Sequence, residues 1–262
     1  MATDFVTNTV NVKIEGRVAT VQMNRPESLN ALDKEMIRGL TARLKEISIS
    51  DDIDIVVLTG NDRAFSSGGD IKSMLSMKDE SDFFPIMDCI NELVITIYSL
   101  PMLTISAVSG AAAGLGLSLA LATDYILADE KSKLAMNFIG IGLIPDGGAH
   151  FFLERRLGED KAKQLIWEGK TLTASEALQL SLIHEVASDY KEALNQKIED
   201  WLNKPIQAMV KTKKILAENN RPHLLKILEI EKHAQYKMRQ TEDHLEGIKA
   251  FVEKRKPQFT GK

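Results

Sequence analysis

Cysteine is nearly absent from this sequence, which contains a single one, Cys89, among its 262 residues. A lone cysteine excludes an internal disulfide framework and is typical of a reducing compartment, so we interpret Cys89 as a small buried hydrophobic residue. Histidine is also scarce, with five residues, and none is spaced with a second type of metal ligand. We therefore predict no metal site.

Strong charge of one sign and long apolar runs are missing too. The 33 basic and 37 acidic residues leave a net charge of −4, which gives no field that attracts nucleic acid or an anionic membrane. The apolar stretches are too interrupted to span a bilayer, and residues 1–6 lack the basic and apolar segments of a secretory signal. We expect a cytoplasmic protein without nucleic-acid or membrane partners.

What the sequence does contain is an alternation of short apolar runs and helix-like segments. Val10–Ile14 and Val18–Met23 predict a hairpin that turns at residues 15–17. Residues 33–47 place apolar side chains at helical spacing, with Asp33 as a candidate N-cap. Buried strands separated by helices pair in parallel through crossovers, so the sequence predicts an α/β fold. The further strands that we predict are residues 54–59, 102–108, 125–129 and 133–138.

The second part of the chain is predominantly helical. Its apolar spacing predicts helices at residues 161–168, 174–180, 191–201, 206–219 and 224–254. No linker-like stretch separates this part from the first, so we expect the helical tail to pack on the α/β part as a second layer. We place a boundary between a core of residues 1–200 and a helical region of residues 201–262.

Two small-residue turns carry most of the functional information: residues 64–72, with Gly68 and Gly69, and residues 109–116, with Gly114 and Gly116. At such turns backbone N–H groups point outward unpaired, and the missing side chains let a ligand come close. Two such turns side by side would direct two N–H donors at one oxygen atom, as in an oxyanion hole. Each turn alone is equally well an ordinary strand-to-helix connection, and neither matches a dinucleotide-binding or phosphate-binding loop.

Several short motifs follow one another along the chain in a specific order and spacing. They are Asn24-Arg25-Pro26, Asn30-Ala31-Leu32, residues 64–72, Ala107-Val108-Ser109-Gly110, Gly114-Leu115-Gly116, residues 141–148 and Glu246-Gly247. In this arrangement the chain resembles the crotonase (enoyl-CoA hydratase/isomerase) family along nearly its whole length. The resemblance implies a crotonase-like spiral of stacked ββα units with the acyl-CoA site in residues 1–200. It also implies that residues 201–262 assemble the chain into a homotrimer or into a hexamer made of two trimers.

The resemblance further implies the substrate and the residues around it. The substrate is an acyl-CoA whose thioester oxygen lies between the backbone amides of Gly69 and Leu115. Because CoA arrives as part of the substrate, no separate cofactor is implied. The other positions that the resemblance assigns to substrate binding are Arg25, Ser28, Ala64, Ser66, Gly68, Asp70, Ile71, Lys72, Phe138 and Lys254.

The catalytic base separates the activities within this family. Typical hydratases use two glutamates to hold a water, and the matching positions here are Ser118 and Phe138, which cannot act as general acids or bases. In a subset of isomerases that includes the ring-opening isomerase of phenylacetate breakdown, one acidic residue follows Ile-Pro or Val-Pro, as Asp146 does here. One carboxylate is enough to move a proton between two carbons. We therefore predict an enoyl-CoA isomerase with Asp146 as its base, in apolar surroundings that raise its pKa toward neutrality.

Other interpretations of the same residues stay open at this point. Asp146 can instead cap a helix that begins near Ala149. The chain can be a hydratase or an acyl-CoA hydrolase with an unidentified base, or a non-catalytic acyl-CoA-binding subunit that has lost both glutamates. Dehalogenase chemistry is disfavoured, because it uses an accompanying histidine and this chain has none before His150.

Overall fold

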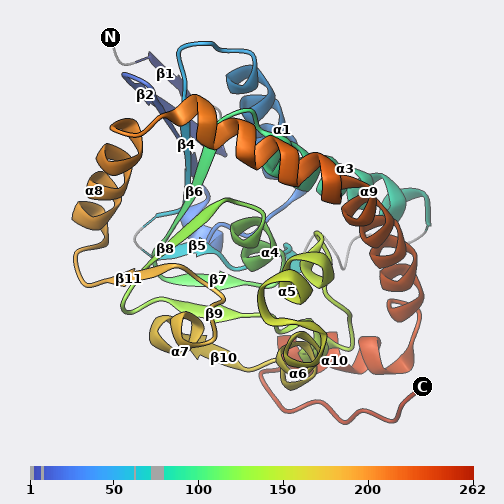
Figure 1. Cartoon of the computed structure of the whole chain (residues 1–262). Helices are drawn as coiled ribbons and strands as arrows, with labels where there is room; N and C mark the ends of the chain where they lie inside the picture. Colours follow the sequence, from blue (N-terminus) through green and yellow to red (C-terminus); the bar gives the residue numbers. More distant parts are fainter. Residues whose placement is uncertain (1–2, 7–8, 62, 72–79) are drawn as a thin grey trace.

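Two largely parallel sheets form the centre of the molecule in the computed structural model, which describes residues 3–6, 9–61, 63–71 and 80–262 (Figure 1). Within those residues the larger sheet has seven strands in the order β1-β2-β3-β4-β6-β8-β11. Strands β1 to β3 are antiparallel and the later ones parallel, which confirms the predicted hairpin and crossovers. The strands are β1 (Thr3–Val6), β2 (Val10–Glu15), β3 (Val18–Met23), β4 (Ile55–Thr59), β6 (Leu103–Val108), β8 (Tyr125–Asp129) and β11 (Glu185–Ala187).

The smaller sheet is built mainly from short strands that each come directly after a strand of the larger sheet along the chain. In the described residues it has the order β10-β9-β7-β5, with β5 (Ala64–Ser66), β7 (Ala111–Ala113), β9 (Lys133–Ala135) and β10 (Thr171–Thr173). Each pair β4/β5, β6/β7 and β8/β9 therefore gives one strand to each sheet before the chain turns into helix or loop. This confirms the predicted spiral of ββα units. The strand predicted at residues 133–138 ends early, because the chain turns into a short 3₁₀ segment, η2 (Phe138–Ile141).

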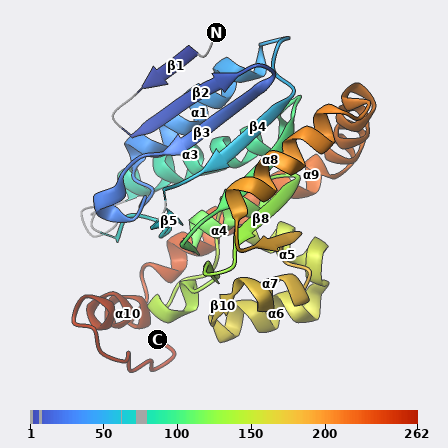
Figure 2. The same ribbon diagram turned by 90° about the vertical axis from the view of Figure 1, so that its left-hand side faces the viewer.

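Helices cover both faces of the larger sheet (Figures 1 and 2). On one face α1 (Lys34–Ser48) packs against α3 (Glu80–Ser99), and Asp33 accepts the N-cap hydrogen bond from the Met36 amide at 2.9 Å, as predicted. On the other face α8 (Tyr190–Leu202) and the start of α9 (Ile206–Met238) bury alternate side chains of β4 and β6. Because both faces are buried, these parallel strands are nearly continuous apolar runs.

The remaining helices surround the smaller sheet and the lower part of the molecule in Figure 1. A short helix, α4 (Leu115–Leu121), follows the second glycine turn, as the sequence predicts. The helix expected after the first glycine turn falls on residues 72–79, outside the described residues. The others are α5 (Ala149–Leu157), α6 (Glu159–Glu168), α7 (Ala174–Gln179) and α10 (Glu242–Val252).

The C-terminal helices differ from the prediction. We expected a break between residues 219 and 224, yet α9 runs unbroken through Pro222. A proline inside a helix removes one backbone hydrogen bond, but Leu224 and Leu228 are buried in the main core and hold the second half of α9 in place. The chain breaks instead at Thr241, whose hydroxyl accepts a hydrogen bond from the His244 amide and begins α10.

The helical tail packs on the core, as the sequence predicts, and α9 contacts α3, α5 and β6. The boundary predicted after residue 200 falls within α8 and stays a prediction, as does assembly into trimers or hexamers. Among the described residues, no helix combines the length and the apolar character needed to cross a bilayer.

A partly buried ion pair ties α9 to the edges of the parallel strands. The Lys213 ammonium lies 2.7 Å from Asp124 and donates to the Met102 carbonyl at 2.8 Å, and its side chain is only 11% exposed. The same Asp124 oxygen also accepts from the amide and the hydroxyl of Thr104, both at 2.8 Å. Burial lowers the pKa of Lys213. The pair thus fixes the first half of α9, and the helix then runs on toward the cavity described below.

We expect Asp124→Ala to destabilise the fold by about 3 kcal/mol, because the change leaves the Lys213 ammonium buried without a counter-charge. Urea denaturation followed by circular dichroism measures this loss. The matched control is Asp160→Ala, which removes a partner of Lys163 at an exposed position and should leave the midpoint nearly unchanged. Similar losses in both variants would contradict the importance of the Lys213 pair.

Candidate active site

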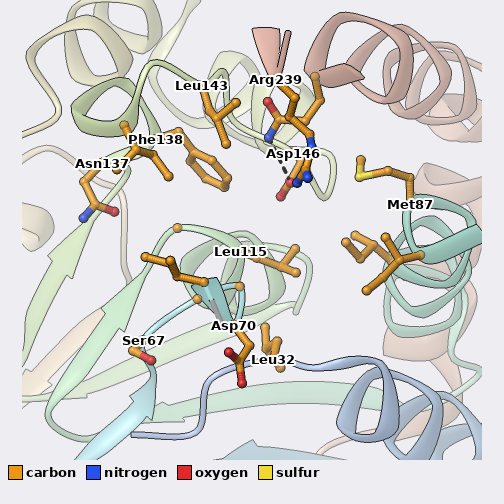
Figure 3. Close-up of a pocket in the computed structure, with 18 of the residues that line it drawn as sticks. Leu32, Ser67, Asp70, Met87, Leu115, Asn137, Phe138, Leu143, Asp146 and Arg239 are labelled. Carbon is orange, nitrogen blue, oxygen red and sulfur yellow. Dashed lines mark hydrogen bonds between the residues drawn. The ribbon is translucent and has the colours of Figure 1, made fainter. Parts of the chain in front are cut away.

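A cavity of about 250 Å³ lies between the two glycine turns, α3 and the end of α9 (Figure 3). Its walls are largely apolar and include Leu32, Phe83, Ile86, Met87, Ile90, Leu115, Phe138 and Leu143. Asp146 and Asp70 lie on opposite sides of it, and further polar groups come from Asn137, Gln235 and Arg239. A mostly apolar cavity with a few directed polar groups is the usual form of a small-molecule site.

The two glycine turns pack directly against each other. A Cβ atom on Gly68, whose φ is +97°, would lie 2.7 Å from the Ala113 carbonyl oxygen and 3.5 Å from the Leu115 amide nitrogen. A Cβ atom on Gly116 would lie 2.7 Å from the Cβ of Ser66. The two distances of 2.7 Å are shorter than the contacts that a real Cβ atom makes. Glycine is therefore needed at positions 68 and 116 for the turns to pack this closely.

The packed turns leave two N–H groups without acceptors at the cavity wall. Gly68 accepts from the Leu32 amide at 2.8 Å and the Asp70 amide donates back to Leu32 at 3.2 Å, which holds the first turn in place. Gly69 and Leu115 line the cavity, and in the described part of the chain neither amide N–H finds an acceptor. These are the two donors that the sequence predicts for an oxyanion hole.

Asp146 lies in the loop between η2 and α5, with only 7% of its surface exposed. Its Oδ2 accepts a hydrogen bond from the Gln235 amide at 3.2 Å, drawn as a dashed line in Figure 3. Its backbone carbonyl accepts one from the Ser118 hydroxyl at 2.8 Å. Ser118, which the resemblance matches to a glutamate of hydratases, therefore helps to orient the loop that carries Asp146.

The pKa of Asp146 is raised from its ordinary 3.8 to about 7. Burial is the main cause and the negative charge of Glu231 adds to it, whereas the Gln235 hydrogen bond and His150 act in the lowering direction. The raised pKa agrees with the sequence-based expectation. Apolar side chains such as Leu115, Phe138 and Leu143 line the same cavity as Asp146.

Glu231, and not Asp146, caps α5. The Glu231 carboxylate accepts hydrogen bonds from the Gly148 amide at 2.7 Å and the His150 amide at 3.1 Å, and it meets the His150 ring at 2.7 Å. The alternative that the Asp146 side chain caps this helix is therefore wrong. Negative charge at a helix N-terminus is favourable, which accounts for a carboxylate that is only 2% exposed.

The sequence analysis missed both Glu231 and Gln235. They stand four residues apart on α9, on the face that also buries Leu224 and Leu228. Apolar spacing predicted a helix from residue 224 onward, but it did not show whether the polar residues at these positions face the core or the solvent. A glutamate and a glutamine in register with two buried leucines are the pattern that could have pointed to them.

The predicted substrate contacts fall into four groups. Gly68, Asp70, Ile71 and Phe138 line the cavity. Lys72 lies outside the described residues. Lys254 follows α10 and is exposed, and it does not line this cavity. As contacts with a ligand, all of these stay predictions.

The four remaining predicted contacts support the first glycine turn from behind instead of lining the cavity. Arg25 forms ion pairs with Asp70 and Asp33, each at 3.1 Å, and the Ser28 hydroxyl donates to the Arg25 carbonyl at 3.2 Å. Ala64 and Ser66 are fully buried in β5. The Ser66 hydroxyl accepts from the Gly68 amide at 3.1 Å, so this side chain shapes the turn.

The arrangement is suited to removing a proton next to a carbonyl group. A carboxylate with a pKa of about 7 can both accept and return a proton at neutral pH. Two free N–H groups across the same cavity can stabilise the oxygen on which negative charge develops. Across the described ranges, no group of three or more potential metal ligands comes together.

Comparisons with known proteins agree with this geometry. The family model described as enoyl-CoA hydratase/isomerase matches residues 13–262. A Bacillus subtilis (strain 168) protein, YhaR, whose name assigns it to the enoyl-CoA hydratases/isomerases, is 45% identical over 95% of this chain and 98% of its own length. The 1,2-epoxyphenylacetyl-CoA isomerase of Escherichia coli (strain K12) is 33% identical over 95% of this chain and 97% of its own. The crystal structure of an enoyl-CoA hydratase from Mycobacterium avium subsp. paratuberculosis K-10 matches with a TM-score of 0.87 and 32% identity, over 97% of this chain and 99% of the other.

We expect Asp146→Asn to be more stable than the wild type at about pH 8, by roughly 4 kcal/mol, and equally stable below about pH 4. A carboxyl group whose folded-state pKa is raised supports the fold below its unfolded pKa, and this stability is lost as the pH rises through about 7. Asparagine has no charge to bury and escapes that loss. Thermal unfolding of both proteins across this pH range measures the difference, and a difference that does not change with pH would show that titration of Asp146 is not its cause.

Proposed function

Because this chain belongs to the enoyl-CoA hydratase/isomerase family, we propose that it is an enoyl-CoA isomerase that works through an enolate with Asp146 as its single base. The observation that carries the proposal is the carboxyl group of Asp146, whose pKa is about 7 and which faces the same apolar cavity as two free backbone N–H groups. The likeness to a relative named 1,2-epoxyphenylacetyl-CoA isomerase supports an isomerase and extends the proposal to strained-ring acyl groups.

In the proposed reaction the thioester oxygen accepts hydrogen bonds from Gly69 and Leu115. Asp146 takes a proton from C2 of a 3-enoyl-CoA, and the charge moves onto the thioester oxygen. The enolate is stabilised more than the ground state, and each preorganised donor contributes roughly 3 kcal/mol to that difference. Asp146 then returns the proton to C4, which gives the 2-enoyl-CoA. The reaction needs no metal and no redox cofactor.

The surroundings of Asp146 do not favour the two-carboxylate mechanism of hydratases. Ser118 is buried, and its hydroxyl is engaged with the Asp146 carbonyl. Phe138 contributes only apolar surface to the cavity. The negative charge of Glu231 raises the pKa of Asp146, but the Glu231 carboxylate accepts hydrogen bonds from the amides at the start of α5 and does not line the cavity. Asp70 lies on the opposite side of the cavity (Figure 3) and is paired with Arg25, so a water molecule beside Asp146 would have one carboxylate to activate it.

We expect Asp146→Asn to lower isomerisation of 3-enoyl-CoA by roughly 100-fold or more, because a general base is lost. The assay follows double-bond movement and uptake of deuterium from D2O across several chain lengths. The matched control is Asp70→Asn, which makes the same change at the opposite side of the cavity and should affect KM more than the chemical step.

Other outcomes of this assay would point to other functions. Equal activity of Asp146→Asn and wild type would remove Asp146 from the mechanism. Addition of water as the main reaction would show a hydratase. Binding of acyl-CoA esters without exchange or turnover would favour a non-catalytic subunit.

We expect Gly68→Ala to lower the same activity by roughly 100-fold, because its Cβ would push the Ala113 carbonyl and displace the two N–H donors from each other. Gly16→Ala is the control, since Gly16 also has a positive φ, of +57°, but has open space around it in the distant β2–β3 turn. Activity should survive that change. Loss of activity in both variants would mean that backbone strain, and not the contact between the turns, is responsible.

A further inference from the structure

Gln235 is a buried polar residue that the proposed mechanism has not yet used. It lies one helical turn after Glu231 on α9, is 2% exposed and lines the cavity. Its Nε2 donates to Oδ2 of Asp146 at 3.2 Å, across 89 residues of sequence. A helix from the end of the chain thus places an amide directly against the base.

Two oxygen atoms of this pair lack hydrogen-bond donors. Asp146 Oδ1 and Gln235 Oε1 are both buried, and in the described part of the chain neither has a partner. A buried acceptor without a donor is costly, and such atoms are rare in folded proteins. Here the two atoms belong to the same two groups that already meet through Nε2 and Oδ2.

One proton would satisfy both oxygens. A carboxylate only accepts hydrogen bonds, whereas a carboxylic acid also has an O–H donor. A primary amide offers a donor and an acceptor side by side, so it can form one hydrogen bond with a carboxylate and two with a carboxylic acid. When Asp146 is protonated on Oδ1, its O–H can donate to Gln235 Oε1 while Nε2 continues to donate to Oδ2.

We propose that Gln235 is a positioning residue that holds the proton on Asp146 Oδ1 between its removal from one carbon of the substrate and its return to another. This inference rests on the proposed isomerase function and deepens it. The C2–H bond breaks and an O–H bond forms at Oδ1, while the electron pair moves onto the thioester oxygen. In the second step the O–H bond breaks, a C4–H bond forms and the carboxylate is restored.

The surroundings of the pair favour this retention. Asp146 and Gln235 are 7% and 2% exposed, so water has little access to the proton. The charged groups near them are Glu231 of α9, Arg239 directly after α9 and His150 of α5, and Asp70 lies on the opposite side of the cavity. Glu231 and His150 are paired with each other, and the Arg239 guanidinium lies over the Phe83 ring at 5.2 Å. Among the described residues, those of α3 that line the cavity are apolar, such as Phe83 and Met87.

The experiment uses a 3-enoyl-CoA that carries deuterium at C2, in ordinary water, and counts the deuterium that reaches C4 of the product. We expect the wild type to retain deuterium and Gln235→Met, which has similar length but no amide, to retain at most about half of the wild-type fraction. Met87→Leu is the control, because it changes an apolar part of the same cavity wall and keeps both partners of the Asp146–Gln235 hydrogen bond. It should retain deuterium like the wild type, whatever its rate.

The outcome separates this role from a structural one. If Gln235→Met turns over more slowly but retains the wild-type fraction of deuterium, Gln235 only supports the fold and the inference is wrong. Glu231→Gln provides a second comparison, since it removes a neighbouring charge but keeps the amide partner of Asp146. Its pH profile should move to lower pH while deuterium retention stays as in the wild type.

A second measurement does not depend on turnover, so the inference can fail independently of the proposed function. Infrared difference spectra between about pH 5 and about pH 9 show the carbonyl band of protonated Asp146, which is identified by its loss in Asp146→Asn. The band should shift to higher wavenumber in Gln235→Met, because the acid loses its amide partner. An unchanged band would overturn the inference even in an active isomerase, whereas a shifted band in a protein without isomerase activity would overturn only the proposed function.

Discussion

The hydrogen bonds between the Glu231 carboxylate and the amides of Gly148 and His150 are the interaction on which the site depends. They join α9 to the start of α5 and so fix the end of the loop that carries Asp146. The same carboxylate, buried beside Asp146, adds to the effect of desolvation and raises the pKa of the base. The carboxylate that caps α5 is therefore also a charged neighbour of Asp146. Removing it would change both the position of Asp146 and its affinity for protons.

The second constraint is the closeness of the two glycine turns. Gly68 and Gly116 allow the turns to approach to distances that any Cβ would block, and the approach directs the amides of Gly69 and Leu115 into one cavity. Ser66, fully buried, holds the first turn through the Gly68 amide. The donors are part of the backbone of packed elements, so they need little reorganisation when negative charge develops. The positions of the two N–H donors and the position of Asp146 are thus determined by separate parts of the fold.

The sequence predicted the elements whose pattern is local. The β2–β3 hairpin, α1 with its Asp33 cap and the central parallel strands follow from apolar spacing and capping chemistry, and the glycine turns follow from composition. Three-residue strands such as β7, made only of alanine, have no period to detect. The unbroken α9 could not be predicted either, because burial of Leu224 and Leu228 outweighs the local effect of Pro222. Glu231 and Gln235 were missed for the same reason, since their partners lie more than 80 residues away, at 81 and 89 positions in sequence.

These observations suggest how activities can diverge on this fold. In the proposed mechanism the glycine turns stabilise an enolate, and they do not determine where the proton goes next. The surroundings of Asp146 determine that step, and α9 contributes to them a charge through Glu231 and an amide through Gln235. The helix can present them because it is held at one end by Lys213 and Asp124 and in its middle by Leu224 and Leu228. On this proposal, a substitution on the buried face of α9 can alter proton transfer without touching Gly69 and Leu115, the proposed donors to the thioester oxygen. These donors and Asp146 lie between residues 69 and 146, and the groups that adjust the proton transfer come from a later element, α9.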